Sequence, residues 1–320
     1  MGSLEIRSLG LQKTQGIIKK FGLVIQEKFV VREDDPMIID RERIREVLPY
    51  GDAFLLVDGI TEASGNTASG IVRDVGEWQI VKNLPEPSSL NYEYVLIDQS
   101  TVYPDNFVGI MHVEAHMHHF AGHFADKPLL PGVQNIEAAA ESSRDLASLL
   151  LANKKGLRST RLSRIVNWKL KRKIVPGEEL IVVGSKSAVE KDLAVINARS
   201  MVDDEPASYG TLHFQPLELS DDYHPGKATI IPCHVVEAAC QIGAYLILGH
   251  PDNHSKLLML AEVNAAVFLE SICPGQELQI RTKLLSRIRR NFGKAGFTVD
   301  NLGHTLAYGT FTFRLADKNT

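Results

Sequence analysis

The residues best suited to proton-transfer chemistry are one histidine and the glutamate that follows it. His123 stands in the run Gly122-His123-Phe124, and Pro131, Gly132 and Glu137 come after it. A histidine accepts a proton near neutral pH, and a carboxylic acid can deliver one. A helix that begins near Gly132 would also point unpaired backbone N–H groups at a developing negative charge. The segment therefore carries the residue types that acid–base catalysis needs.

The same pattern of residues occurs twice in the chain. Glu137-Ala138-Ala139 recurs as Glu237-Ala238-Ala239, at an offset of 100. Two further matches follow in the same order: Pro176-Gly177 recurs as Pro274-Gly275, and Tyr209-Gly210-Thr211 recurs as Tyr308-Gly309-Thr310. Pro-Gly turns and Ala-rich helices can recur by chance, but a nearly constant offset favours two copies of one structural unit.

Each copy is expected to contain one long helix followed by an antiparallel meander. The helices are predicted from about Pro131 to Ala152 and from about Pro232 to Gly249, because proline suits the first turn of a helix. Alternating apolar residues predict the strands at 165–173, 179–187, 194–203 and 209–217, then at 261–270, 276–287, 293–300 and 305–315. This order predicts an α+β unit in which a sheet wraps around a buried helix.

The two copies are expected to differ in length. Residues 1–37 form an N-terminal extension, and residues 38–219 form the first unit, with a short helix at 41–47 and a strand at 54–60. An insert at about 78–109 cannot be assigned. Residues 220–320 form a shortened second unit without front strands of its own, and residues 16–32, which alternate apolar side chains, are a candidate to supply one.

Two motifs resemble those of the β-hydroxyacyl-acyl carrier protein dehydratases of fatty-acid synthesis, which have the hot-dog fold. The first motif is Leu48-Pro49-Tyr50 with Phe54-Leu55-Leu56-Val57-Asp58, and the second runs from Gly122-His123-Phe124 to Glu137. Tyr50 stands where the family has histidine, and Ala125-Asp126 replaces the usual Pro-Gly. The resemblance implies a fused double hot dog, a pseudo-dimer with continuous sheets and with its two helices side by side. It implies no cofactor and no metal.

The resemblance also implies a reaction and roles for the residues. A dehydratase removes water from a 3-hydroxyacyl thioester, carried by acyl carrier protein or by CoA, in fatty-acid or polyketide biosynthesis. His123 would take the C2 proton, a glutamate of the central helix would protonate the leaving hydroxyl, and the Gly132 N–H would bind the thioester carbonyl. Phe124, Pro131 and Val133 would contact the substrate.

The family builds each active site from two hot dogs, with the histidine from one and the acid from the other. In the second copy Tyr223 takes the histidine position and Pro232, which has no N–H, takes the glycine position. In the first copy the helix glutamine has become Glu141, one turn from Glu137, and two carboxylates so close repel. The intact set is predicted to be His123, Gly132, Glu237 and Gln241, and the degenerate set Tyr223, Pro232, Glu137 and Glu141.

Composition narrows the remaining function classes. The formal charge of −4 argues against a nucleic-acid partner, and no apolar run is long enough for a membrane helix. Three cysteines imply no disulfide framework, which fits a cytoplasmic protein. The histidines between 112 and 119 suggest a metal site, but a strand approaching the active site is the favoured interpretation.

Several alternatives stay open at this level. A hot-dog thioesterase and a non-catalytic acyl-chain-binding protein both compete with the dehydratase. The basic runs at 169–173 and 287–290 are equally compatible with solvated strand edges and with docking of an acidic carrier protein. Assembly into a homo-oligomer of double hot dogs is also left open.

Overall fold

The computed structural model describes residues 39–51, 54–73, 96–115, 117, 120, 122–124, 127–152, 160–217, 232–272, 276–286 and 288–318. The chain divides into two compact units, Met1–Asp35 and Pro36–Thr320, and every described residue belongs to the second. The candidate strand at 16–32, and Tyr223, lie outside the described residues. Within the described ranges no helix is long and apolar enough to cross a membrane.

The first copy follows the predicted order of one helix and a meander. Helix α3 (Gly132–Leu151) begins directly after Pro131, whose extended backbone lies at the N-cap. The strands are β6 (Thr160–Leu170), β7 (Glu179–Glu190), β8 (Leu193–Val202) and β9 (Glu205–Pro216). Asp203 and Asp204 both have positive φ, which suits the tight hairpin between β8 and β9.

The second copy repeats this order. It contains α4 (Pro232–Leu248), the short 3₁₀ helix η4 (Pro251–Asn253) and the strands β10 (Lys256–Phe268), β11 (Leu278–Leu284), β12 (Phe292–Asn301) and β13 (His304–Asp317). Leu302 and Gly303, with positive φ, form the hairpin that matches the one in the first copy. Both predicted helices are present, and their ends agree with the prediction within about one residue.

The front strands belong to a different copy from the one that the sequence suggested. The chain begins with β1 (Ile39–Asp40), α2 (Arg41–Val47), β2 (Gly59–Ser64) and β3 (Thr67–Val72). Strand β3 pairs with β11, with Gly70 opposite Ile280. The prediction that these strands belong to the first unit, and that the second unit lacks front strands, is therefore wrong. Alternating apolar residues define a strand without defining which sheet edge it joins.

The unassigned insert supplies the front strands of the first copy. Its described part forms β4 (Gln99–Val102) and β5 (Asn106–His112), and β5 pairs with β7, with Ile110 opposite Ile181. The first copy is therefore inserted in the chain between β3 and α4 of the second copy. The predicted strand at 54–60 also lies too early in the chain, since β2 begins only at Gly59.

The two copies share one antiparallel sheet of 13 strands, in the order β1-β2-β3-β11-β12-β13-β10-β6-β9-β8-β7-β5-β4. They join where β10 pairs with β6, with Val263 opposite Trp168. The Arg161 guanidinium reinforces this seam by donating to the carbonyl oxygens of Phe268, at 2.8 Å, and Leu269, at 3.1 Å. The predicted double hot dog with a continuous sheet is confirmed.

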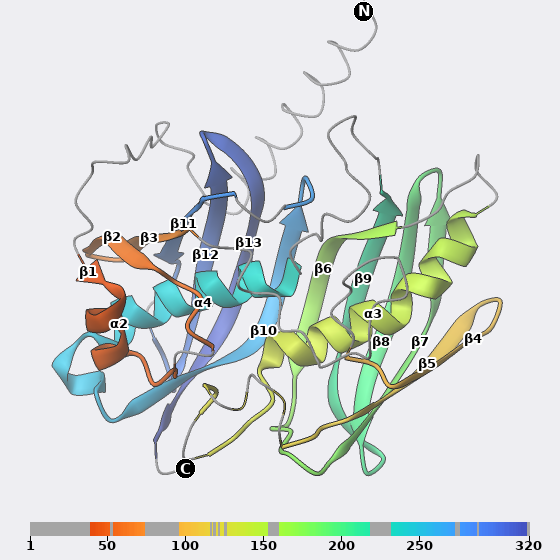
Figure 1. Cartoon of the computed structure of the whole chain (residues 1–320), viewed down its shortest axis with the longest axis horizontal. Helices are drawn as coiled ribbons and strands as arrows, with labels where there is room; N and C mark the ends of the chain where they lie inside the picture. Colours follow the sequence, from red (N-terminus) through yellow and green to blue (C-terminus); the bar gives the residue numbers. More distant parts are fainter. Residues whose placement is uncertain are drawn as a thin grey trace, which may run out of the picture. The chain divides into compact units, whose positions relative to one another are not determined.

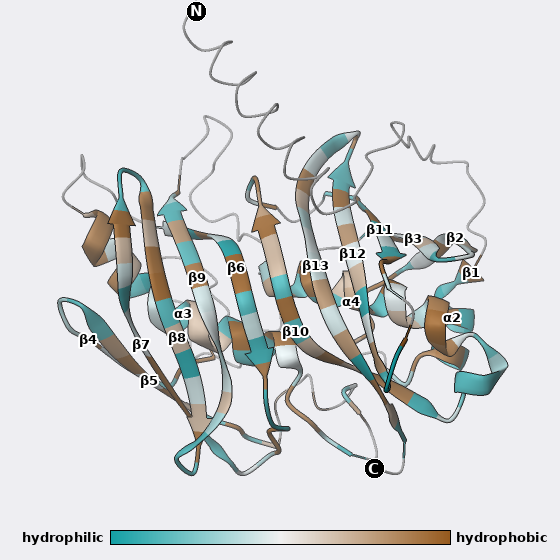
Figure 2. Cartoon of the chain, turned by 180° about the vertical axis from the view of Figure 1, so that it is seen from behind, coloured by the Kyte–Doolittle hydropathy of each residue, from teal (hydrophilic) through white to brown (hydrophobic). Residues whose placement is uncertain are grey.

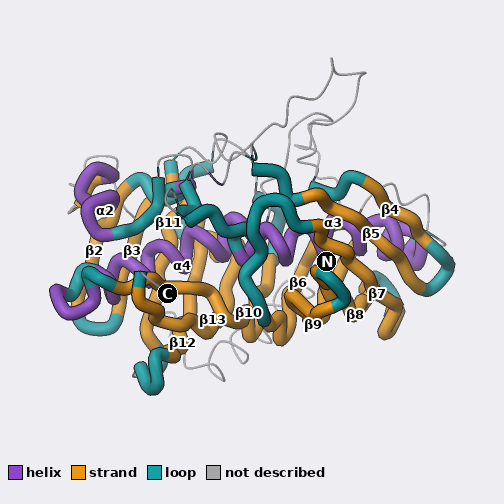
Figure 3. Tube along the Cα trace, turned by 90° about the horizontal axis from the view of Figure 1, so that it is seen from below, coloured by secondary structure: helices purple, strands orange, loops and turns teal. Residues whose placement is uncertain are grey.

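Both long helices cover the same face of the sheet. Helix α4 lies over the β11–β13 half and α3 over the β6–β9 half (Figures 1 and 3). Strands such as β8 bury alternate residues. Apolar and polar residues accordingly alternate along the strands when the sheet is seen from behind (Figure 2). Helix α3 buries its Ala-rich face, and α4 is buried over most of its length. The core therefore lies between the helices and the sheet.

The repeated Tyr-Gly-Thr motif has a packing explanation. A Cβ at Gly210 would lie 2.7 Å from the Trp168 ring, and a Cβ at Gly309 would lie 2.4 Å from the Ala265 carbonyl oxygen. Each glycine therefore lets its strand approach the neighbouring strand at the centre of the joined sheet. The backbone contact at Gly309 leaves no flexible group that could move aside.

We expect Gly210→Ala and Gly309→Ala each to lower the free energy of unfolding by about 1–3 kcal/mol, the usual effect of overpacking. Urea denaturation measures the change. Gly65→Asn is the control, because Gly65 has φ of +56° and nothing within 4 Å of a built Cβ, and asparagine tolerates this backbone. Unchanged urea midpoints in both alanine variants would contradict the packing explanation.

Candidate functional site

The loop that carries His123 comes from the first copy and is held by the second. The Gly51 N–H donates to the Gly122 carbonyl oxygen at 3.0 Å. A Cβ at Gly122 would lie 2.7 Å from the Phe54 backbone nitrogen, so only glycine permits this approach. Gly122 therefore brings the His123 loop against residues 50–58 of the other copy, which form its front segment.

The orientation and protonation of the His123 ring follow from its neighbours. Nδ1 lies 2.9 Å from the Leu129 carbonyl oxygen. Because a carbonyl only accepts, Nδ1 carries the proton and Nε2 carries the lone pair of the neutral ring. The ring stacks on Phe124 at 4.2 Å and meets the edge of Phe54 at 5.2 Å. Burial lowers the pKa of His123 to about 4, so the ring is a neutral base at pH 7.

Glu237 is the buried carboxyl of α4, with 4% of its surface exposed. Burial raises its pKa to about 7, against the opposing effect of hydrogen bonds from Gln241 and Tyr50. The Gln241 Nε2 donates to its Oε1 at 3.3 Å. A carboxyl with this pKa retains its proton in a substantial fraction of molecules at neutral pH, and it can therefore serve as an acid.

Gln241 fixes the motif that runs from Phe54 to Asp58. Its Oε1 accepts from the Leu56 N–H at 2.8 Å, and its Nε2 donates to the Phe54 carbonyl oxygen at 2.8 Å. The side chain is fully buried, so that losing either bond would leave polar backbone atoms unpaired. Gln241 thus anchors the front segment on the helix that carries Glu237.

Tyr50 stands where the family motif has histidine, and the sequence pattern alone assigns it no role. Its ring lies 5.8 Å from the His123 ring, between centroids, and its hydroxyl interacts with the Glu237 carboxyl. The imidazole from one copy and the carboxyl from the other therefore lie next to the same side chain. The family histidine at this position was the signal in the sequence that could have identified Tyr50 as a site residue.

The remaining residue of the predicted intact set lies at the N-terminus of α3, next to two of the predicted substrate contacts. Gly132 is the first residue of α3, so its N–H has no intrahelical acceptor. A Cβ there would lie 2.5 Å from the Leu170 side chain and 3.7 Å from Leu260, which places this helix end at the β6–β10 seam. Pro131 and Val133, on either side of Gly132, are buried, as is Phe124 beside His123.

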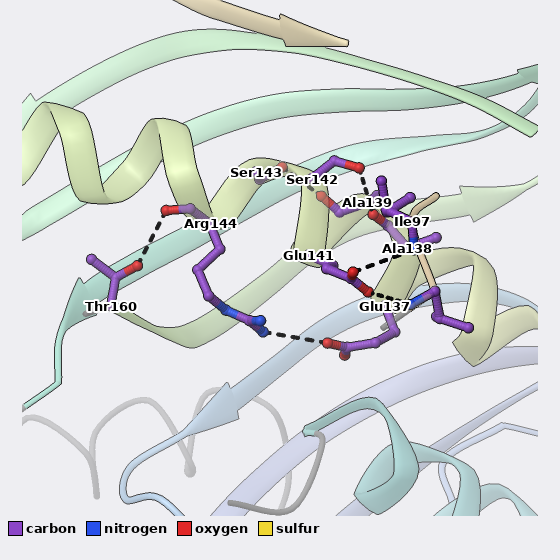
Figure 4. A network of polar contacts seen from close by, with 10 residues as sticks. Ile97, Glu137, Ala138, Ala139, Glu141, Ser142, Ser143, Arg144 and Thr160 are labelled. Carbon is purple, nitrogen blue, oxygen red and sulfur yellow. Dashed lines mark hydrogen bonds and ion pairs between the residues drawn. The ribbon is translucent and has the colours of Figure 1, made fainter. Parts of the chain in front are cut away.

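The glutamates of the predicted degenerate set make internal contacts (Figure 4). Glu137 Oε1 lies 3.4 Å from Arg144 Nη2, while its buried Oε2 has no hydrogen-bond partner among the described residues, although the Cys233 thiol lies nearby. Glu141 accepts from the backbone N–H groups of Leu96, at 2.8 Å, and Ile97, at 3.3 Å. Glu141 therefore anchors residues 96–97, the front segment that leads into β4 of its copy, as Gln241 anchors the front segment of the other copy.

Burial raises the pKa of both glutamates. Burial raises the pKa of Glu141 to about 7, and the charge of Glu137 adds to the increase. For Glu137 the charge of Arg144 opposes the effect of burial on the pKa.

The other two residues of the predicted degenerate set are Pro232 and Tyr223. Pro232 begins α4 and has no N–H, while Tyr223 lies outside the described residues.

The histidine-rich stretch is described only in part. His112 ends β5, with Nδ1 3.1 Å from Asp98 and Nε2 3.2 Å from Glu179. His116, His118 and His119 lie outside the described residues.

Comparison with known proteins identifies the family. The family model for the ApeI-like dehydratases matches residues 99–202, which include His123 and α3. A 3-hydroxyacyl-[acyl-carrier-protein] dehydratase FabZ of Streptococcus uberis is 30% identical over 135 residues, which is 42% of this chain and 95% of that protein. The Streptococcus pyogenes FabZ is 32% identical over 124 residues, covering 38% of this chain and 88% of that protein. The chain belongs to the FabZ-type dehydratase family.

A likeness also exists among solved structures. The dehydratase domain of RzxB from Pseudomonas fluorescens superposes with a TM-score of 0.47 at 12% identity, covering 68% of this chain and 98% of that domain. This chain differs from the FabZ-type motif at Tyr50, whose ring and hydroxyl lie in the candidate site.

We expect nitrogen-detected NMR to show that the His123 ring is neutral at pH 6, with its proton on Nδ1. The ring should gain its second proton with a midpoint near pH 4. Burial also lowers the pKa of His234 to about 4, so the His123 signals are assigned by their loss in His123→Gln. A His123 titration near pH 6.5, or a proton on Nε2, would contradict the geometry of the site.

Proposed function

We propose that the chain removes water from a 3-hydroxyacyl thioester to give a trans-2-enoyl thioester. The observation that carries the proposal is the meeting of a neutral histidine from one copy with a protonatable carboxyl from the other at Tyr50. This pair of protonation states is what an elimination with a base and an acid requires at neutral pH.

His123 acts as the base. Its Nε2 lone pair takes the proton from C2, and the C2–H electron pair moves toward the thioester carbonyl. The resulting imidazolium is stabilised by the Nδ1–H bond to the Leu129 carbonyl oxygen, an interaction that favours the charged ring. The N–H of Gly132 donates to the thioester oxygen, where negative charge accumulates.

Glu237 acts as the acid. It gives its proton to the C3 hydroxyl as the C3–O bond breaks, so that water leaves and the double bond forms between C2 and C3. After one turnover His123 holds one extra proton and Glu237 lacks one, and transfer of that proton resets the site. Gln241 donates to the carboxylate in this state.

The substrate's carrier is acyl carrier protein or CoA, and exposed cations beside the His123 loop support both. Lys127 follows Phe124 in this loop, and Lys173 precedes Ile174, whose carbonyl oxygen accepts from the Leu130 N–H at 2.8 Å. Lys127 and Arg314 both add to the lowering of the Lys173 pKa, which burial causes first, so these three cations lie near one another. Such a group attracts the phosphate that both carriers possess.

The competing activities give different products from one substrate. Crotonyl thioesters of acyl carrier protein and of CoA are incubated with the protein and followed by mass spectrometry. A dehydratase adds the mass of one water in the reverse reaction, and a thioesterase releases free thiol. A protein that only holds acyl chains leaves both thioesters unchanged, and either of these two outcomes would overturn the proposal.

We expect His123→Ala and Glu237→Gln each to lower the dehydration rate by about 10²–10⁴-fold, the usual contribution of an acid–base group. The double variant should lose little more, because the two residues act in one step. Glu137→Gln is the matched control, the same substitution at the repeat position, and its rate should stay near that of the wild type. A rate loss in Glu137→Gln with none in Glu237→Gln would reverse the assignment.

A further inference from the structure

Tyr50 enters the candidate site from the front segment of the second copy. It precedes Gly51, whose N–H bonds to Gly122 in the His123 loop. The segment is also fixed from the other side, because Gln241 binds the backbone at Phe54 and Leu56. The backbone that carries Tyr50 is therefore tied to both parts of the site.

The Tyr50 ring is enclosed by aromatic side chains. Its centroid lies 5.5 Å from that of Phe124, 5.8 Å from His123 and 6.1 Å from Phe54, and the residue is 8% exposed. Rings at these separations pack in contact with one another. The side chain therefore has a single enclosed position, with its ring against the His123 imidazole.

The Tyr50 hydroxyl interacts with the Glu237 carboxyl. Burial, followed by the charge of Glu237, raises the pKa of Tyr50 well above 10, so the hydroxyl keeps its proton. A protonated phenol beside a carboxylate donates, and Tyr50 thus joins Gln241 as a donor to Glu237. The two donors approach from different elements, the front segment and α4.

We propose that Tyr50 is a positioning residue that holds the Glu237 carboxyl through its hydroxyl and the His123 imidazole through its ring. It fixes the separation of base and acid across the two copies, and it sets how readily the acid gives up its proton. The inference rests on the proposed dehydratase function for its effect on rate. Its effect on Glu237 itself does not require turnover.

The sign of the effect follows from the chemistry of the pair. A donor stabilises the ionised carboxylate more than the protonated acid, so removing the donor raises the pKa of Glu237. The other groups around Glu237 are Gln241, which is not ionisable, the buried Cys240 thiol, whose pKa burial raises well above 9, and His123 beyond the Tyr50 ring. None of these is changed when the Tyr50 hydroxyl is removed.

Tyr50→Phe tests the proposal, because it removes the hydroxyl and keeps the ring. Infrared difference spectra follow the protonated-carboxyl band of Glu237 with pH, and the band is assigned by its loss in Glu237→Gln. We expect the midpoint to move upward by roughly one pH unit in Tyr50→Phe. The falling limb of the kcat/KM profile should move upward with it, and kcat should fall.

A second substitution reverses the sign and guards against a general loss of structure. Replacing Tyr50 with 3-fluorotyrosine keeps the ring and makes the hydroxyl a stronger donor, so the Glu237 midpoint should move downward. Tyr245→Phe is the matched control, since Tyr245 lies on α4 near Arg43 and Glu46 and should leave the Glu237 midpoint unchanged.

The outcomes separate this inference from the proposed function. An unchanged Glu237 midpoint in both Tyr50 variants, or movement in the same direction in both, would overturn the role of Tyr50. Absence of dehydration in the wild-type protein would overturn the proposed function, while the infrared midpoints would still decide whether Tyr50 holds Glu237.

Discussion

The candidate site depends on the pairing of β6 with β10, because this pairing makes one sheet from two copies. The seam places the N-terminus of α3 against Leu170 and Leu260, one from each copy. The Gly51–Gly122 bond then brings the front segment of the second copy onto the His123 loop of the first. Neither copy alone holds both His123 and Glu237, so the site exists only where the copies join.

Fusion of two copies lets the two halves of the repeat take different roles. In a symmetric pair both helices would need the same residues. Here the residue one helical turn after the repeated glutamate is Gln241 in one copy and Glu141 in the other. Both side chains hold a front segment through backbone hydrogen bonds. Glu137, paired with Arg144, faces a different set of contacts from those of Glu237. The structural function of the repeat is thus kept in both copies, while the contacts of its two glutamates have diverged.

The sequence predicted the elements better than their partners. Helices α3 and α4 were predictable because a proline lies directly before the first residue of α3 and at the first residue of α4, and because the repeat fixes their register. The partner of β3 was not predictable, because its apolar alternation fits any open sheet edge. His123 and Glu237 could be named from motif and repeat. The contacts of Tyr50 could not, because its hydroxyl reaches a residue far along the chain, on the other side of the inserted copy.

A crystal structure with the amide analogue of a 3-hydroxyacyl pantetheine thioester would test the one-site account most directly. The account predicts one analogue per chain, with C2 beside His123 Nε2, the 3-hydroxyl at Glu237 and the carbonyl oxygen at the Gly132 N–H. Two analogues per chain at equivalent positions, or a single analogue beside Glu137, would contradict it.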